Sequence, residues 1–185
     1  MPTKLEGRND TPRILAVDPA LSTTGYAVIS IADKKIVYAN KFCTSSKKSY
    51  DERVTDIVTE LFSIAVQYGV VGIVLENSFL GKNPKTAMDL SELRGSICGV
   101  FAFNKYLVCK MTPSEIRAHL GIGGGASKLD VAMYLINTLY KDDPKIQKIG
   151  PYSDKQNKDK TSDIYDAISI GAAFCEFSER GSANA

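Results

Sequence analysis

The sequence predicts an α/β domain with a five-stranded mixed sheet flanked by helices. Hydrophobic residues make up 44% and charged residues 24% of the 185 residues, a composition typical of a globular chain that buries a core. Short apolar runs rich in β-forming residues alternate with longer segments whose apolar residues recur at helical spacing. The length favours one domain. We expect it to span residues 13–177 between flexible polar tails at 1–12 and 178–185.

Three strands are expected at the start of the domain. Residues 13–18 form a short apolar run that ends at an Asp-Pro turn signal, and further apolar runs follow at 25–31 and 35–43. Only a short turn at 32–34 separates the last two runs. An antiparallel meander is the simplest arrangement of three strands joined in this way.

A helix and a buried strand come next. Residues 50–68 carry apolar side chains on one helical face, namely Val54, Ile57, Val58, Leu61, Ile64 and Ala65. Residues 70–76 are apolar up to Glu76, which indicates a central strand buried on both faces. A strand–helix–strand passage of this kind favours a parallel crossover. A second helix is expected at 86–104 and a fifth strand at 106–111.

The last third of the chain is expected to be mainly helical. Thr-Pro-Ser-Glu at 112–115 is a strong helix start, and a glycine-rich break follows at 121–125. Ser127 precedes a helix at 128–140. Residues 141–160, with six Lys and four Asp, are predicted to form a lysine-rich loop. The final helix is expected from about 161 to 177.

Charge and cysteine usage limit the class of protein. The net charge of +2 is too small to be a clear footprint of nucleic-acid binding, but residues 79–128 contain seven basic and three acidic residues. The four cysteines form no Cys-x-x-Cys pair, which favours free thiols in a reducing compartment. No secretion signal and no membrane span is recognisable. We therefore expect an intracellular protein that does not bind membranes.

Four acidic residues stand out by position. Asp18 and Glu76 each end an apolar strand run, whereas Asp163 and Asp166 share one helix face at i, i+3. A turn role for Asp18 and a helix-capping role for Asp163 are the alternatives when each is taken alone. If the four converge, their hard oxygen ligands suit Mg²⁺, with Mn²⁺ as a substitute. Such a set can hold two ions about 4 Å apart for attack on a phosphodiester.

Three segments resemble the acidic motifs of the RuvC family of Holliday junction resolvases. The segment 15–28, with Asp18-Pro19-Ala20 and then Thr24-Gly25-Tyr26, is similar to the first motif. The segment 74–83, followed by Leu93-Arg94-Gly95, looks like the second. Asp163-Ile-Tyr-Asp166-Ala resembles the C-terminal motif. The likeness runs from about residue 13 to 177.

The resemblance implies a ribonuclease H-like fold and a homodimer that cuts four-way DNA junctions in recombination and repair. Cleavage would be a Mg²⁺-dependent, two-metal hydrolysis by paired nicks, giving a 5′-phosphate and a 3′-hydroxyl. By carry-over, the metal ligands are Asp18, Glu76, Asp163 and Asp166. Lys128 joins them as a catalytic residue near the scissile phosphate.

The resemblance also implies a set of DNA contacts. Phe79 matches the position that wedges into the junction, although an ordinary core aromatic is the alternative. Arg117 and Lys128 keep the spacing of two basic residues near the cut phosphate, with solvated surface charges as the alternative. Further DNA contacts are expected from Lys82, Lys85 and Arg94.

Departures from the family pattern leave other interpretations open. Ala20 stands where the family usually has Gly, and the segment 141–160 looks longer than usual, so its lysines either contact DNA or are solvated. These features fit a phage or viral-type member acting in a bacterial cytoplasm or an infected host cell. A YqgF-like RNA-processing nuclease and a non-catalytic junction-binding protein are the alternative functions. His119 has either a helix-end or a catalytic role, and Gly95, Ser96 and Gly99 form either a dimer contact or a contact with the sheet.

Overall fold

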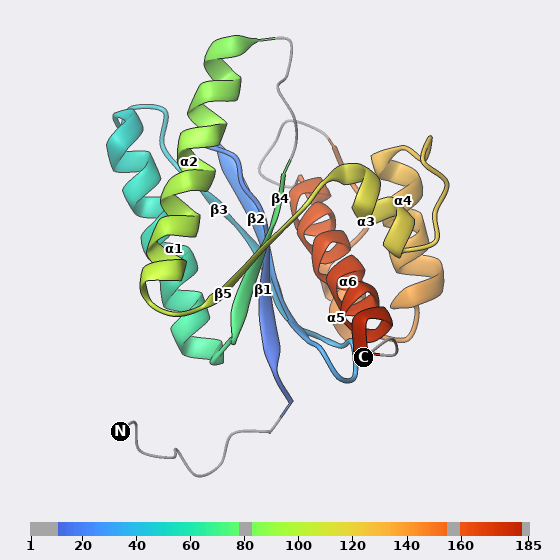
Figure 1. The fold of residues 1–185 in the computed structure, drawn as a ribbon. Helices are drawn as coiled ribbons and strands as arrows, with labels where there is room; N and C mark the ends of the chain where they lie inside the picture. The colour runs from blue at the N-terminus through green and yellow to red at the C-terminus, as the bar shows by residue number, and fades with distance from the viewer. Residues whose placement is uncertain (1–10, 78–82, 155–159, 183–185) are drawn as a thin grey trace, which may run out of the picture.

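One mixed sheet forms the centre of the molecule (Figure 1). The computed structural model describes residues 11–77, 83–154 and 160–182. Its five strands lie in the order β3-β2-β1-β4-β5. The strands are β1 (Arg13–Asp18), β2 (Thr23–Ser30), β3 (Ile36–Cys43), β4 (Gly72–Glu76) and β5 (Leu107–Met111).

Pairing within the sheet confirms the predicted class. β1, β2 and β3 pair antiparallel as a meander, whereas β4 is parallel to β1 and β5 is parallel to β4. The helices that make the two parallel crossovers lie on the same side of the sheet (Figure 1). They are α1 (Tyr50–Tyr68) and α2 (Pro84–Phe103).

The other side of the sheet is covered by α6, with the shorter helices packed around it (Figure 1). The two sides separate along β1, where Leu15 and Val17 pack toward α1 and α2, and Ile14 and Ala16 pack toward α6. This alternation is the period of two expected for a strand buried on both faces. The helices on this side are α3 (Pro113–His119), α4 (Lys128–Tyr134), the π-helical turn η1 (Leu135–Leu139), α5 (Pro144–Ile149) and α6 (Ser162–Ser182).

The first turn of α6 lies directly on β2. A Cβ atom at Gly25 would be 1.8 Å from the carbonyl oxygen of Asp163, so only glycine allows this approach. A Cβ at Gly171 would be 2.5 Å from Ile29 Cδ1, so the contact between helix and sheet stays close two turns further on. The position of α6 is therefore fixed by glycines in both elements.

The C-terminal third differs from the prediction in three ways. The predicted loop at 141–160 contains α5, because Asp143 caps it through the backbone N–H of Lys145 and Ile146 is buried beneath it. The predicted helix at 128–140 has π-helical geometry from Leu135 to Leu139. The last helix does not end at 177 but continues to 182.

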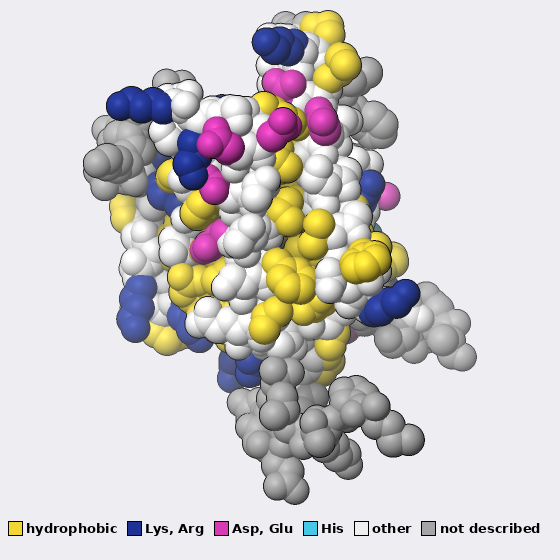
Figure 2. Space-filling view, turned by 90° about the vertical axis from the view of Figure 1, so that its left-hand side faces the viewer, with side chains coloured by type: hydrophobic (Ala, Val, Ile, Leu, Met, Phe, Trp, Pro, Cys, Tyr) yellow, Lys and Arg dark blue, Asp and Glu magenta, His cyan; other side chains and the backbone are white. Residues whose placement is uncertain are grey.

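The small residues of α2 do not pack on the sheet. Gly95 and Gly99 are exposed, and no heavy atom lies within 4 Å of a Cβ built at either one. Of the two interpretations of this face, contact with its own sheet is therefore wrong. On the side of the molecule that carries α1 and α2, hydrophobic side chains gather across the middle, below a group of acidic ones (Figure 2).

Two further observations concern the cysteines and the helices of the described residues. Cys43, Cys98, Cys109 and Cys175 are all free thiols. Within 11–77, 83–154 and 160–182, none of the helices combines the length and the apolar character needed to cross a lipid bilayer.

Candidate active site

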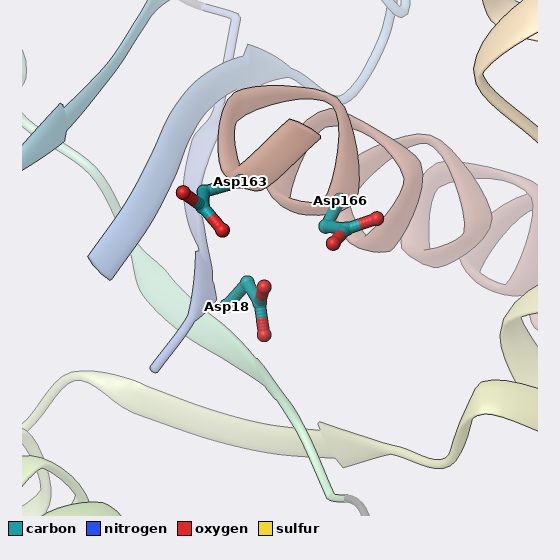
Figure 3. Close-up of side chains that lie close together, drawn as sticks. All are labelled: Asp18, Asp163 and Asp166. Atoms are coloured by element: carbon teal, nitrogen blue, oxygen red, sulfur yellow. The ribbon is translucent and has the colours of Figure 1, made fainter. Parts of the chain in front are cut away.

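Three carboxylates meet where the end of β1 faces the start of α6. Asp18 is the last residue of β1, and Asp163 and Asp166 lie in the first two turns of α6. One oxygen from each lies within 4.8 Å of the others. Figure 3 shows the three side chains around one shared space. The structure therefore brings together three of the four acids that the sequence singled out.

The backbone explains this convergence. Asp18 of β1 pairs with Gly25 of β2, and the carbonyl of Asp163 rests against the same glycine. The start of α6 thus packs on the sheet beside the end of β1. Asp166 follows three residues later on the same helix face.

Glu76 borders this cluster from the neighbouring strand. It ends β4, whose residue Leu75 lies beside Val17 in the parallel register, so its side chain comes to the same edge of the sheet as Asp18. It is not one of the three acids that meet within 4.8 Å. Its charge nevertheless acts on Asp18, as the pKa of that group shows.

The cluster is electrostatically unfavourable by itself. Burial, followed by the charges of Asp166 and Glu76, raises the pKa of Asp18 to about 7. Burial is also the largest cause of the raised pKa values of Asp166 and Glu76. Like charges that lose solvent resist ionisation. A cation at the cluster would relieve this repulsion.

Lys128 provides one positive charge. The capping box of Ser127 and Asp130 places Lys128 as the first residue of α4, and its Nζ forms an ion pair with Asp166 Oδ2. The lysine side chain is 60% exposed. Desolvation acts to lower its pKa, but Asp166 and the neighbouring carboxylates outweigh this effect and raise it.

Lys160 provides the second charge. Its Nζ lies 2.9 Å from Asp163 Oδ1, at i, i+3 in the chain. In the sequence, Lys160 is one of the six lysines of the predicted 141–160 loop. Its i, i+3 spacing from Asp163 could be read from the sequence. Which side of the helix start its side chain occupies could not.

A cavity of about 600 Å³ opens over these residues. Tyr152 and Asp154 line it beside Lys128, Lys160, Asp163 and Asp166, and neither was predicted as a site residue. A larger cavity of about 760 Å³ lies near the turn between β2 and β3, at the opposite end of β1, and holds none of the predicted site residues.

The acidic residues fit a hard divalent cation. Asp163 is only 7% exposed, and its Oδ2 atom is buried with no hydrogen-bond partner. A buried carboxylate oxygen without a partner is costly unless a ligand completes it. The donors are carboxylate oxygens with no thiolate or imidazole, which is the set preferred by Mg²⁺, Mn²⁺ and Ca²⁺.

The remaining predicted DNA contacts have different surroundings. Lys85 is exposed in the first turn of α2. Arg94 and Arg117 are partly buried, and their charges act to lower the pKa of Glu76 against the larger effect of its burial. Phe79 and Lys82 lie outside the described residues.

His119 lies away from the cluster. Its ring packs edge-on against Phe177 at a centroid distance of 5.3 Å. Phe177 is eleven residues beyond Asp166 along α6, or about 16 Å at the rise of an α-helix. This placement agrees with the helix-end role rather than the catalytic one.

The raised pKa of Asp18 predicts how the stability of the metal-free protein depends on pH. Its folded value of about 7 exceeds the ordinary 3.8, so the folded state binds the extra proton between these values. The free energy of unfolding should therefore fall as the pH rises from 5 to 8, by about 2.5 kcal/mol. Thermal unfolding in EDTA measures this change.

Two comparisons control that measurement. Mg²⁺ should restore stability at pH 8, because cations would offset the repulsion among the ionised carboxylates. Asp18→Asn should flatten the profile between pH 5 and 8. A metal-free wild-type protein that gains stability over this range would contradict the prediction.

Comparison with known proteins identifies the family. The family described as crossover junction endodeoxyribonuclease RuvC matches residues 14–151. RuvC of Ehrlichia ruminantium (strain Gardel) is 28% identical over 162 residues, covering 85% of this chain and 92% of that protein. RuvC of Brachyspira hyodysenteriae is 30% identical over 125 residues, covering 66% and 78%.

Solved structures agree on the fold. T. thermophilus RuvC in complex with Holliday junction substrate matches with a TM-score of 0.70 at 15% identity, covering 92% of this chain and 97% of that one. The yeast mitochondrial Holliday junction resolvase matches with a TM-score of 0.70 at 14% identity, covering 96% and 83%. The predicted ribonuclease H-like fold is thereby confirmed. Together with the match over residues 14–151, the fold shows that this chain belongs to the RuvC family of crossover junction endodeoxyribonucleases.

Proposed function

We propose that this chain is a Mg²⁺-dependent endonuclease that resolves four-way DNA junctions by paired nicks. The observation that carries the proposal is the meeting of Asp18, Asp163 and Asp166 within 4.8 Å, on the fold of a resolvase family. A relative of the same fold was solved with a Holliday junction substrate bound. A binding protein would gain nothing from a cluster of carboxylates that repel one another.

Asp18, Asp163 and Asp166 would hold the cations, with Glu76 at the border of the site. Bound there, two Mg²⁺ ions would supply an activated water and stabilise the charge on the phosphate, giving a 5′-phosphate and a 3′-hydroxyl. The backbone supports this arrangement, because Gly25 of β2 pairs with Asp18 of β1 and lets the start of α6 pack beside it. This preorganisation is the main contribution of the fold.

Lys128 would contact the phosphate at the cut. Its ammonium is paired with Asp166. When that carboxylate is neutralised by a cation, the exposed lysine side chain is released toward the cavity and can balance charge that develops on the phosphate. Arg117 is partly buried, and its charge acts on Glu76, so it would act on the site through that residue.

A homodimer would present two such sites to one junction. The exposed face of α2 and β5 supports this assembly, since Met88 is 70%, Phe103 83% and Leu107 72% exposed. Gly95 and Gly99 lie on the same helix and allow close approach of a second backbone. Phe79 would open the junction, as the family resemblance implies.

Phe103→Asp should convert the dimer to a monomer. The substitution places a charge at the centre of an apolar contact, where burial without a partner is strongly unfavourable. Sedimentation velocity measures the mass. Val66→Asp on α1, also at an exposed hydrophobic position (52%), is the control and should leave the mass unchanged. A dimer that persists in Phe103→Asp would place the contact elsewhere.

The activity itself is tested with matched substrates. The protein is incubated with a synthetic four-way junction, a linear duplex of the same sequence and an RNA duplex, each with Mg²⁺ or EDTA. We expect cutting of the junction alone, in symmetric positions, and only with Mg²⁺. Cutting that survives EDTA, or equal cutting of linear duplex, would overturn the proposal, and preferential cutting of RNA would favour the RNA-processing alternative.

A further inference from the structure

The two oxygens of Asp163 have different surroundings. Oδ1 accepts a hydrogen bond from Lys160 Nζ at 2.9 Å, whereas Oδ2 is buried and has no partner. Figure 3 shows one oxygen of Asp163 directed toward Asp18 and Asp166 and the other directed away from them. Lys160 therefore occupies one oxygen and leaves the other for a ligand.

The backbone holds Lys160 in this place. Its carbonyl accepts a hydrogen bond from Lys41 Nζ of β3. The next two residues, Thr161 and Ser162, donate their backbone N–H groups to the carbonyl of Ser153, both at 3.0 Å. The residue is thus tied to β3 on one side and to the segment before it on the other. Its side chain is 32% exposed, against 10% for Asp163.

We propose that Lys160 is a positioning residue that presents Asp163 to a metal ion through one oxygen only, and that it thereby favours Mg²⁺ over Ca²⁺ at this site. Mg²⁺ takes six ligands in a near-ideal octahedron and keeps several waters, so one oxygen per carboxylate suits it. Ca²⁺ takes six to eight oxygens and readily accepts both oxygens of one carboxylate. An ammonium held on Oδ1 prevents that second mode.

The charge of Lys160 has a separate effect that must be removed from the test. A positive charge beside the site weakens the binding of every divalent cation by the same electrostatic amount. The ratio of Ca²⁺ to Mg²⁺ affinity cancels this effect because the two ions carry the same charge. A change in the ratio therefore reports how Asp163 is presented, and a lysine that only stabilises the fold would not alter it.

The experiment is isothermal titration of the full chain without DNA, using MgCl₂ and CaCl₂ separately. Lys160→Met removes the ammonium, and it should shift the affinity ratio toward Ca²⁺ by about tenfold. Lys160→Arg keeps a cationic donor and should keep the wild-type ratio. Lys145→Met, at an exposed lysine of α5, is the matched control and should also keep it. Lys160→Ser repeats the test with the same expectation should the methionine variant not fold.

The outcomes separate this inference from the proposed metal site on which it rests. An unchanged ratio in Lys160→Met, with both ions still bound, overturns the role of Lys160 and leaves the metal site intact. Binding of neither ion by the wild type, or binding that Asp163→Asn does not weaken, overturns the metal site and the inference together. The inference is supported if the affinity ratio shifts toward Ca²⁺ only in the variants that lack the lysine ammonium, Lys160→Met and Lys160→Ser.

Discussion

Asp18→Asn is expected to slow junction cleavage by about 10³-fold or more while making the metal-free protein more stable at pH 8. Removing a carboxylate from the centre of the cluster removes a ligand and the charge stabilisation that depends on it. The same change relieves the repulsion that raises the pKa of Asp18 to about 7. The gain should approach the about 2.5 kcal/mol that the wild type loses between pH 5 and 8.

Cleavage under single-turnover conditions and thermal unfolding in EDTA measure the two effects. Asp142→Asn is the matched control, because Asp142 is an exposed acid that lines the cavity at the other end of the molecule. It should change neither quantity. Loss of both activity and stability in Asp18→Asn would show that this carboxylate serves the fold, contrary to our interpretation.

Gly25→Ala is expected to destabilise the protein by about 3 kcal/mol or more and to abolish cleavage. The added Cβ would lie 1.8 Å from the carbonyl oxygen of Asp163. Because the obstacle is backbone, the start of α6 must move, and Asp163 and Asp166 move with it. For a domain of this size, that loss lowers the melting temperature by about 10 °C.

Gly181→Ala is the control for this substitution. Gly181 lies in α6 itself, and no heavy atom is within 4 Å of a Cβ built there. Alanine is the better helix former, so stability should stay the same or rise slightly. Full activity and an unchanged melting temperature in Gly25→Ala would mean that the close packing of α6 on β2 does not position the site.

Patterns that depend on one element or on neighbours in the chain could be predicted from the sequence. The short apolar run along 13–18 and the apolar run before Glu76 identified strands whose ends lie at one edge of the sheet, and the structure places Asp18 and Glu76 there. The i, i+3 spacing of Asp163 and Asp166 fixed their shared helix face. These features follow from periodicity, which tertiary packing did not override.

Features that depend on contacts between distant segments could not be predicted. Composition alone marked 141–160 as a loop, although the Asp-Pro pair at 143–144 is a helix start and Ile146 finds a buried place only in the folded chain. The packing of α6 on β2 depends on Gly25 and Asp163, which are 138 positions apart in the chain. The pairing of Lys160 with one oxygen of Asp163 depends on how β3 and the segment 150–154 hold the start of α6.

We propose above all that Asp18, Asp163 and Asp166 bind the catalytic cations. Anomalous diffraction from crystals of the full chain grown with Mn²⁺ tests it most directly, because manganese is located by its own signal. We predict an anomalous peak in contact with all three carboxylates, with Lys128 withdrawn from Asp166. Manganese bound only elsewhere, with the cluster still closed by Lys128 and Lys160, would contradict it.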